Sequence, residues 1–311
     1  MPTHIVQSSE WGEFKTKYGT PSVRVGNVQY TKHKIPFSNF YYAYCPRVNP
    51  FDIDFEALKK SAAANNCINI NFDVPNVVKD SEEASKAIEI LEKNCQKAPR
   101  DQFAKGNVVL DISGAEDEIM AKMHNKHRYN IKYAARNGVT VRQAEKPEDF
   151  ELFYKLYTET AERQKYYGRP HLYLRDLWDI FFPAKIAHII IGEYNGVALA
   201  SWLLMAYEGV LYYPYGGSSE QYKNLFGSSL VAWESIKLGK SLGCKSFDMW
   251  GTSVDPNDTA DSYYGFTNFK LRFGGKHVVY IDSYDLVLNE HIYSMFNSAN
   301  NLRWKLLKIL K

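Results

Sequence analysis

The chain has 311 residues, which is enough for one large domain or two domains of about 150 residues, and we expect two. A hydrophobic content of 45% with 23% charged residues excludes an intrinsically disordered chain. The net charge of +3 excludes a polycation that coats nucleic acid, so contact with a polyanion would require a local cluster of Lys and Arg.

The sequence carries no signal for secretion or membrane insertion. Its N-terminus, MPTHIVQSSEW, lacks the basic and apolar regions of a signal peptide, and no apolar run approaches the roughly 20 residues that span a bilayer. The cysteines are widely spaced and predict free thiols in a reducing compartment: Cys45, Cys67, Cys95 and Cys244. We therefore expect a cytoplasmic monomer that contacts, at most, the inner face of the membrane.

The first part of the chain predicts a mixture of helices and strands. Ser8 or Ser9 is placed to cap a short amphipathic helix that carries Trp11, Phe14 and Lys15. Runs of β-branched and aromatic residues predict strands over residues 22–30, 32–35, 40–44, 68–72 and 107–112. Two further helices are expected, over residues 54–65 and from residue 80 or 81 to residue 94.

A basic segment follows, over residues 122–142, with no acid between Glu118 and Glu145. Arg128, Lys132 and Arg136 recur at i, i+4 and i+8, so they share one face of a helix. Like charges at that spacing repel one another, and a solvated structural helix would normally carry acids between them. The pattern therefore favours a phosphate-bearing partner, while a solvated face of a helix between domains is the alternative.

The second part of the chain predicts a strand, two helices and then a sheet. The strand is expected over residues 139–143, the helices over 147–164 and 172–182, and further strands over 187–194, 197–206 and 210–215. Asn195-Gly196 is a hairpin turn. A Gly/Ser-containing loop, a helix and strands over residues 246–250 and 277–284 follow. This order is similar to that of an acetyltransferase-like (GNAT) domain.

The loop before that helix, Asn224–Ser229, retains a single glycine where GNAT enzymes cradle the pyrophosphate of coenzyme A with backbone N–H groups. Bulky Phe226 stands beside that glycine. These departures disfavour a coenzyme A site.

One helix end and the loop after it form a candidate anion-binding cluster. The segment TETAERQKYYGRP brings together Thr160, Arg163, Tyr167 and Arg169. A loop arginine flanked by tyrosines can clamp a phosphate or carboxylate while a ring stacks on a base or sugar. The structural alternative is an ion pair between Arg163 and Glu159 or Glu162.

The stretch SYYGFTNFKLRFGGK, residues 262–276, places Lys270 among aromatic residues. Burial among such residues lowers the pKa of a lysine, which can then shuttle a proton or face developing negative charge. The alternative is a surface lysine on an aromatic-rich strand or short helix. Asp258 and Asp261 precede Lys270 in an acidic loop and are candidates for a general base.

Several segments, in this order, resemble the Fem family of peptidoglycan aminoacyltransferases. They are the opening residues 7–15, KHRYNIKYAARNGV, TETAER, FDMWGTSVDPND and the Phe269-Lys270 pair. No long charged heptad insertion is present, so the chain resembles the compact Fem X type. The resemblance implies an α+β (mixed α/β) fold of two tandem GNAT-like domains. We expect domain 1 over residues 1–138 with a C-terminal return over 286–311, and domain 2 over 139–285.

The resemblance also implies a reaction. A member of this family would transfer an amino acid from aminoacyl-tRNA, without a cofactor or metal, to an amine on the stem peptide of UDP-MurNAc-pentapeptide or lipid II. Lys270 would face the oxyanion or the leaving oxygen, Phe269 would shield it, and Asp258 or Asp261 would act as the base. The residues expected to bind the precursor are Lys15, Thr160, Arg163, Tyr167, Arg169 and Tyr215.

Two other functions stay open. One is a coenzyme A-dependent N-acyltransferase on the same fold, and the other is a catalytically silent protein that binds precursor, tRNA or glycan on a tyrosine-rich groove. The tail, NLRWKLLKILK, adds an apolar stripe with basic neighbours that either docks on the protein itself or lies on an anionic membrane. The residues of the stripe are Leu302, Leu306, Ile309 and Leu310.

Overall fold

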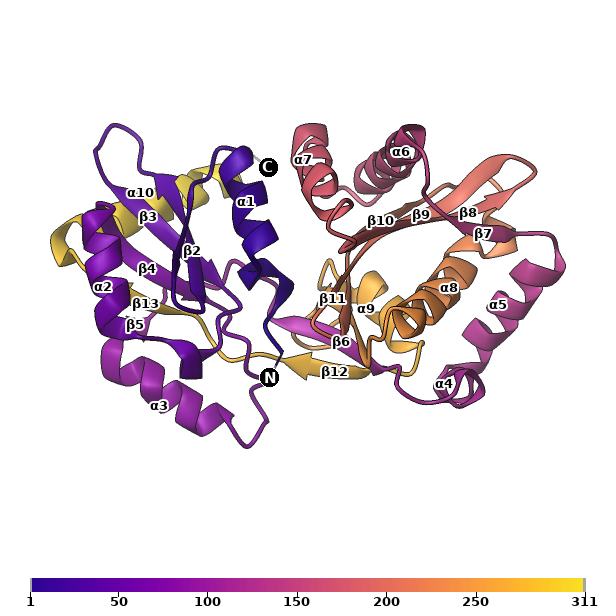
Figure 1. Ribbon diagram of the computed structural model, residues 1–311, viewed down its shortest axis with the longest axis horizontal. Coiled ribbons are helices and arrows are strands. Elements are labelled where there is room, and N and C mark those ends of the chain that lie inside the picture. The colour runs from indigo at the N-terminus through magenta and orange to yellow at the C-terminus, as the bar shows by residue number, and fades with distance from the viewer. Residues whose placement is uncertain (1, 310–311) are drawn as a thin grey trace. The chain divides into compact units, whose positions relative to one another are not determined.

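A computed structural model describes residues 2–309, and over these residues the chain forms two compact units (Figure 1). Unit 1 comprises Thr3–Phe103 and the segment from Tyr280 onward, and unit 2 comprises Ala104–Val279. Each unit contains a mixed sheet flanked by helices, which confirms the expected mixed α/β fold.

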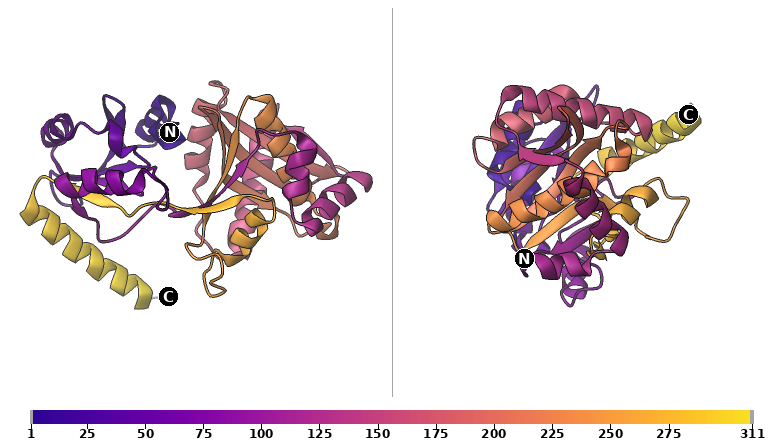
Figure 2. Two further views of the ribbon diagram at one scale, coloured as in Figure 1. Left: turned by 90° about the horizontal axis from the view of Figure 1, so that it is seen from below. Right: turned by 90° about the vertical axis from the view of Figure 1, so that its right-hand side faces the viewer.

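The described part of unit 1 has a six-stranded sheet in the order β1-β2-β3-β4-β13-β5. Its strands are β1 Ser22–Val25, β2 Val28–Lys34, β3 Tyr41–Pro46, β4 Cys67–Asp73, β5 Gln96–Lys97 and β13 Tyr284–Val287. Its helices are α1 Ser9–Lys17, α2 Phe55–Ala64, α3 Ala84–Asn94 and α10 Glu290–Ile309, the last of which is the long yellow helix of Figure 2. The hydroxyl of Ser8 accepts a hydrogen bond from the Trp11 N–H and caps α1, as predicted.

The two faces of the unit 1 sheet differ in chemistry. One face packs on the apolar sides of α2 and α3, through residues such as Leu58 and Leu91. β4 is buried along its whole length, and its alternate residues Asn69, Asn71 and Asp73 are polar. The Asn69 and Asn71 side chains donate to Asp285 on β13, at 2.9 Å each. This sheet therefore carries an apolar core on one side and a buried hydrogen-bonded network on the other.

The described part of unit 2 has a seven-stranded sheet in the order β12-β6-β11-β10-β9-β8-β7. The strands are β6 Gly106–Asp111, β7 Thr140–Gln143, β8 Ala187–Tyr194, β9 Val197–Tyr207, β10 Val210–Ser218, β11 Ser246–Thr252 and β12 Lys276–Val279. The helices are α4 Glu116–Lys122, α5 Asn125–Arg136, α6 Pro147–Arg163, α7 His171–Phe181, α8 Gly227–Ser241 and α9 Tyr264–Leu271. Helices α6 and α7 lie on one side of the sheet and α8, with α5 packed on it, lies on the other (Figure 1).

The two units repeat one arrangement. In unit 1, antiparallel β2 and β3 lead through α2 to β4, which is parallel to β3. In unit 2, antiparallel β9 and β10 lead through α8 to β11, which is parallel to β10. Each sheet also contains an antiparallel strand from outside these consecutive elements. In unit 1 this strand is β13, which pairs with β4, and in unit 2 it is β6, which pairs with β11. The chain is thus a tandem repeat whose two sheets are each completed by a strand from elsewhere in the sequence.

This pairing moves the domain boundaries from the expected positions. The expected first domain ended at residue 138, but β6 and the helices α4 and α5 belong to unit 2 because β6 pairs with β11 and β12. The strand expected over residues 277–284 is two strands, β12 in the unit 2 sheet and β13 in the unit 1 sheet. Helix α3 begins at Ala84, later than expected, because the Ser81 hydroxyl instead donates to the Val78 carbonyl in a turn.

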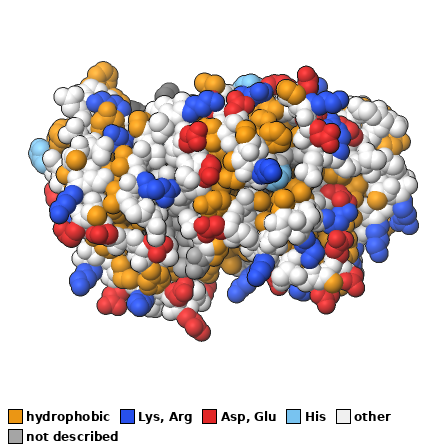
Figure 3. Space-filling model, in the orientation of Figure 1, with side chains coloured by type: hydrophobic (Ala, Val, Ile, Leu, Met, Phe, Trp, Pro, Cys, Tyr) orange, Lys and Arg blue, Asp and Glu red, His pale blue; other side chains and the backbone are white. Residues whose placement is uncertain are grey.

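Helix length, surface charge and the C-terminal tail are the features relevant to contact with a membrane. No helix among the residues described is long and apolar enough to cross a membrane. Lys and Arg are interspersed with Asp and Glu on the face drawn in Figure 3. Tail residues 301–309 lie on helix α10, on which Leu302 is exposed. The other members of the expected stripe, Leu306, Ile309 and Leu310, lie outside the residues whose side chains are described.

Replacing Gly217 by Ala should destabilise the protein. A Cβ at this β10 position would come within 2.2 Å of the Leu156 carbonyl oxygen, because the α6 backbone lies directly against the strand. Backbone cannot move aside as a flexible side chain can, so we expect a loss of about 1–3 kcal/mol in the free energy of unfolding, measured in urea.

Gly265→Ala is the matched control. A Cβ at Gly265, inside α9, meets nothing within 4 Å, so alanine there should be neutral or stabilising by up to about 1 kcal/mol. Equal effects of the two substitutions would contradict the close packing of α6 on β10.

Candidate functional site

The candidate site is built where β11 departs from regular pairing. The register of β11 against β6 shifts between Asp248 and Gly251, and Trp250 adopts a left-handed backbone conformation with φ of +64°. The Asp248 carboxylate accepts a hydrogen bond of 2.7 Å from the Trp250 N–H. On β6, the Asn107 side-chain amide donates to both oxygens of that carboxylate, at 2.8 and 2.9 Å. These bonds hold the distorted backbone in place.

Helix α9 delivers Lys270 to this distortion. The side chain is 8% exposed, and its Nζ donates to the Gly251 carbonyl at 2.7 Å and to the Trp250 carbonyl at 3.4 Å. Thr267, one turn earlier, accepts a 2.9 Å hydrogen bond from the Ser253 N–H and so ties α9 to the chain just after β11. An ammonium carries three N–H groups, and the third has no hydrogen-bond partner among the backbone and side-chain groups that the structure describes.

The aromatic ring of Tyr213 lies near the Lys270 ammonium. The Nζ lies 6.0 Å from the ring centroid of Tyr213, which stacks on Trp202 with centroids 3.7 Å apart. Phe269, the expected shield, instead turns toward the core, with its ring 6.3 Å from Trp202 and 5.2 Å from Phe273. Tyr213, which our sequence analysis did not single out, is therefore the ring that the ammonium faces.

This environment changes the acidity of Lys270. Burial lowers the pKa of Lys270 to about 7, and the negative charge of Asp248 partly opposes that effect. Near neutral pH the side chain thus exists as a mixture of ammonium and free amine. A lysine in this state can both give and take a proton, which is a property of catalytic groups.

The acids expected to act as a base accept hydrogen bonds within their own loop. Asp258 is exposed and accepts a hydrogen bond from the Ala260 N–H, and Asp261 accepts one from the Tyr263 N–H. Both carboxylates stabilise turns in the loop that leads into α9. The acid whose charge acts on Lys270 is Asp248, which the sequence analysis did not identify. An acidic residue within the otherwise apolar strand sequence FDMW could have indicated it.

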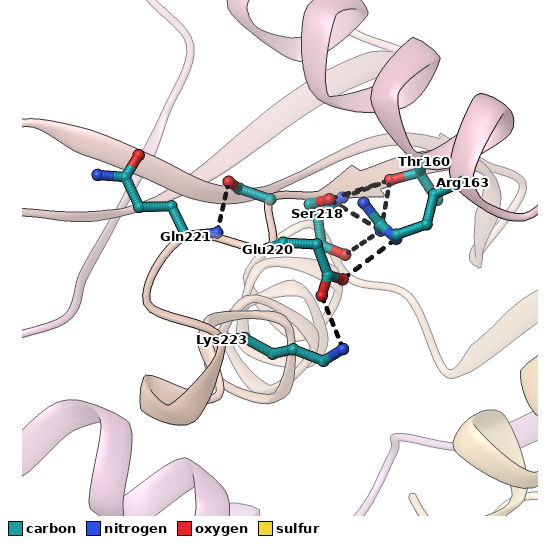
Figure 4. A network of polar contacts seen from close by, with 7 residues as sticks. Thr160, Arg163, Ser218, Glu220, Gln221 and Lys223 are labelled. Atoms are coloured by element: carbon teal, nitrogen blue, oxygen red, sulfur yellow. Dashed lines mark hydrogen bonds and ion pairs between the residues drawn. The ribbon is translucent and has the colours of Figure 1, made fainter.

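Arg163, at the end of α6, forms the second part of the candidate site (Figure 4). Its Nη2 donates to the Ser218 carbonyl at 3.0 Å and to the Thr160 hydroxyl at 3.2 Å. Its Nε pairs with Glu220 at 3.2 Å, and Glu220 also pairs with Lys223. The ion-pair alternative was therefore correct in kind, but the partner is Glu220 and neither Glu159 nor Glu162. Arg163 joins the end of α6 to the end of β10.

Aromatic contacts link this arginine cluster to α9. The ring of Tyr157 lies 6.0 Å from Tyr215 and 6.4 Å from Tyr166, and Tyr166 lies 6.2 Å from Phe266 on α9. Arg169 lies over the Tyr173 ring at 4.9 Å, and the Tyr215 phenol raises the pKa of Arg169. The structure thus brings most of the expected binding residues to one side of unit 2, while Tyr167 is 90% exposed.

Lys15 belongs to the other unit. It lies on α1 with its Nζ 5.7 Å from the ring centroids of both Phe14 and Tyr18. Burial, followed by the charge of Lys15, lowers the pKa of His33 to about 4. Lys15 is therefore part of an aromatic and histidine cluster of unit 1.

The basic helix α5 is only partly available to a partner. The Arg128 guanidinium donates to the carbonyls of Ala121 and Met123, at 2.8 and 2.9 Å, and so stabilises the end of α4. Lys132 and Arg136 are exposed on the same helix, and the Arg136 Nε donates to the Lys132 carbonyl. Arg128 thus has a structural role that sequence reasoning did not predict.

No metal site accompanies these groups. Over the part of the chain that the structure describes, no cluster of three or more His, Cys, Asp or Glu residues could hold a metal ion.

Comparison with known proteins decides the family. The model of the FemAB family matches residues 1–196 and 191–301, nearly the whole chain. The chain belongs to the FemAB family. Its fold is also that of a solved protein described as FemX, with a TM-score of 0.84 and 19% identity over 94% of both chains.

Curated relatives match over shorter regions. The chain is similar to the lipid II:glycine glycyltransferase of Staphylococcus haemolyticus (strain JCSC1435), with 31% identity over 34% of this FemAB-family chain and 25% of that relative. It is also similar to the UDP-N-acetylmuramoylpentapeptide-lysine N(6)-alanyltransferase of Weissella viridescens, with 26% identity over 60% of this chain and 55% of that relative. The matched regions therefore span a quarter and about half of these two relatives.

Replacing Lys270 by Met should change the pH dependence of stability. The folded pKa of about 7 lies below the ordinary 10.5, so between these values the unfolded state binds more protons and wild-type stability rises with pH. Methionine avoids the cost of a buried ammonium. Its stabilising effect should therefore be largest below about pH 7 and shrink toward about pH 10 in urea unfolding.

Lys245→Met, at an exposed lysine, provides the control and should show no such trend. A constant difference between wild type and Lys270→Met at all pH values would mean that Lys270 keeps an ordinary pKa in the folded state.

Proposed function

We propose that this protein transfers an aminoacyl group from aminoacyl-tRNA to an amine on the stem peptide of a peptidoglycan precursor. Membership of the FemAB family and the transferase names of its relatives support this reaction class. The observation that carries the proposal is the buried Lys270, whose ammonium retains one N–H for a substrate oxygen. The acceptor is UDP-MurNAc-pentapeptide or its lipid-linked form, lipid II.

The reaction requires a proton donor from the protein, whereas the nucleophile is the amine of the acceptor substrate. The acceptor amine attacks the ester carbonyl that joins the amino acid to the tRNA ribose, and a tetrahedral oxyanion forms. Collapse of this intermediate breaks the bond to the ribose oxygen, which leaves as an alkoxide and must be protonated. The amine loses a proton as the new amide forms, so the overall reaction consumes and releases no proton.

Lys270 can stabilise the negatively charged oxygens that form during this reaction. Its free N–H can donate first to the oxyanion and then to the ribose oxygen, and a pKa of about 7 makes that proton easy to give. The Tyr213 and Trp202 rings limit the access of water to the ammonium. Asp258 and Asp261 are the candidates for accepting the proton of the amine, because their loop leads directly into α9.

Arg163 is proposed to bind the diphosphate or the carboxylates of the precursor. The ion pair with Glu220 holds the guanidinium in place between substrates and is half-exposed, so an incoming anion can replace Glu220. Thr160, Tyr167, Arg169 and Tyr215 surround this position or lie on the same loop. Within unit 1, Lys15 is proposed to contact a precursor, and within unit 2 Arg128, Lys132 and Arg136 are proposed to bind the tRNA.

The loop before α8 argues against a coenzyme A-dependent enzyme. Phe226 has a left-handed backbone with φ of +55°, and its ring contacts Tyr133 of α5 at 5.8 Å. A Cβ at Gly227 would lie 2.8 Å from the Leu199 Cβ, so this loop is tightly packed against the protein itself. The proposed donor, aminoacyl-tRNA, requires no coenzyme, and its use would place the reaction on the cytoplasmic side of the membrane.

Lys270→Met should reduce aminoacyl transfer by about 100- to 1000-fold, because the oxyanion and the leaving oxygen lose their proton donor. The assay incubates UDP-MurNAc-pentapeptide or lipid II with a panel of charged tRNAs and detects the added residue by mass spectrometry. Lys245→Met should keep wild-type activity. Absence of transfer from every charged tRNA, together with a higher Tm in acetyl-CoA, would instead favour the coenzyme A enzyme.

Substitutions at Arg163 and Glu220 should act in opposite directions on precursor binding. Arg163→Gln removes the proposed clamp and should raise KM for UDP-MurNAc-pentapeptide by roughly tenfold or more. Glu220→Gln removes the competing carboxylate and should lower KM. If both substitutions raised KM equally, the contacts drawn in Figure 4 would serve only to hold α6 and β10 together and would not bind the precursor.

A further inference from the structure

Asp248 is a buried acid whose place in the fold calls for an explanation. It lies in the middle of β11 between Phe247 and Met249, and its side chain is 4% exposed. A buried carboxylate is costly unless hydrogen bonds or opposite charges satisfy it. An apolar residue would fit a central strand with less difficulty, so the acid is expected to serve something other than the stability of the sheet.

The hydrogen bonds of Asp248 point to the backbone that holds Lys270. One oxygen accepts from the Trp250 N–H at 2.7 Å, two residues along the same strand. That bond fixes a peptide in a conformation that a non-glycine residue rarely adopts, with φ of +64° at Trp250. The next two carbonyls along the chain, those of Trp250 and Gly251, accept hydrogen bonds from the Lys270 ammonium.

Asn107 aligns the carboxylate from the neighbouring strand. It is completely buried on β6, opposite Gly251 in the register, and its amide donates to both oxygens of Asp248. An amide that bonds both oxygens fixes the plane of the carboxylate as well as its position. Hydrogen bonds therefore connect Asn107 to Asp248 and Asp248 to the Trp250 N–H, and the backbone from Trp250 to Gly251 carries the two carbonyls that accept from the Lys270 Nζ.

Charge and geometry act together at this point. The groups known to face or influence the ammonium are Asp248 from β11 and the phenol of Tyr213 from β10, with the Tyr166 phenol acting on Tyr213. Asp248 is the charged one, and its effect favours the protonated form of Lys270. The same carboxylate thus shapes the acceptors of the ammonium and supplies negative charge near it.

We propose that Asp248, aligned by Asn107, is a positioning residue that shapes the β11 bulge around the Lys270 ammonium and places a negative charge near that group. It acts through Lys270 and does not itself contact the substrate. The consequence for aminoacyl transfer rests on the proposed function, but the effect on Lys270 does not. The proposal can therefore be tested on the protein without substrate.

The first measurement is the titration of Lys270 itself, by NMR of protein labelled at the lysine ε carbon. The resonance that disappears in Lys270→Met identifies the residue. In Asp248→Asn the folded protein loses the negative charge, so the Lys270 pKa should fall below that of the wild type. We expect roughly a tenfold lower ratio of ammonium to amine at a given pH.

A paired substitution separates geometry from charge. Asp248→Asn alone places two amide nitrogens opposite each other, which destabilises the fold independently of the change in charge. Combining Asp248→Asn with Asn107→Asp restores a donor and an acceptor across the strands, while the carboxylate moves to the position opposite Gly251. The Lys270 pKa of this double variant should lie between those of Asp248→Asn and the wild type.

The pH profile of kcat supplies the functional readout. If the ammonium is the active form, the fall of kcat at high pH should move to lower pH in Asp248→Asn and return partly in the double variant. A Lys270 titration in folded Asp248→Asn or in the double variant that equals the wild type would overturn the proposal. A shifted titration in a protein that transfers no amino acid would leave the positioning role in place and reject the transferase function.

Discussion

The candidate site depends on holding one ammonium group inside the protein. Lys270 is almost fully buried, and water is replaced by two backbone carbonyls that accept from its Nζ. These carbonyls face Lys270 where the register of β11 against β6 shifts, between Asp248 and Gly251. The incomplete replacement of water by these acceptors is also the reason why burial lowers the pKa of Lys270 into the neutral range.

The exchange of strands between the two halves of the sequence makes this arrangement possible. β6 reaches the unit 2 sheet from before the repeated part of that unit, and it brings Asn107 to the carboxylate of Asp248. In unit 1 the corresponding position is taken by β13, whose Asp285 accepts from Asn69 and Asn71 on β4. The added strand therefore contributes to a buried amide and carboxylate network in both units. In unit 2 that network supports a lysine, and in unit 1 it bonds the Tyr293 hydroxyl of α10.

The guanidinium of Arg163, which we propose binds an anion, is held in place by contacts within the protein. The guanidinium joins α6 to β10 through Ser218, and the close approach of these elements requires Gly217. Its remaining partner, Glu220, lies on an exposed loop and also pairs with Lys223. Solvent screens such a pair, so its contribution to stability is small and a phosphate can compete with it.

The sequence by itself determined the local elements and the identity of the central lysine. The cap at Ser8, the proline that opens α6 and the Asn195-Gly196 hairpin act within a few residues, so their patterns predict structure directly. Only the tertiary structure decided which strands complete each sheet and which acid accompanies Lys270. Asn107 and Asp248 are 141 residues apart in the chain, and no local pattern encodes a contact at that separation. Nearness in sequence pointed to Asp258 and Asp261, which stay candidates for the base, whereas strand pairing brings Asn107 to Asp248, whose charge acts on Lys270.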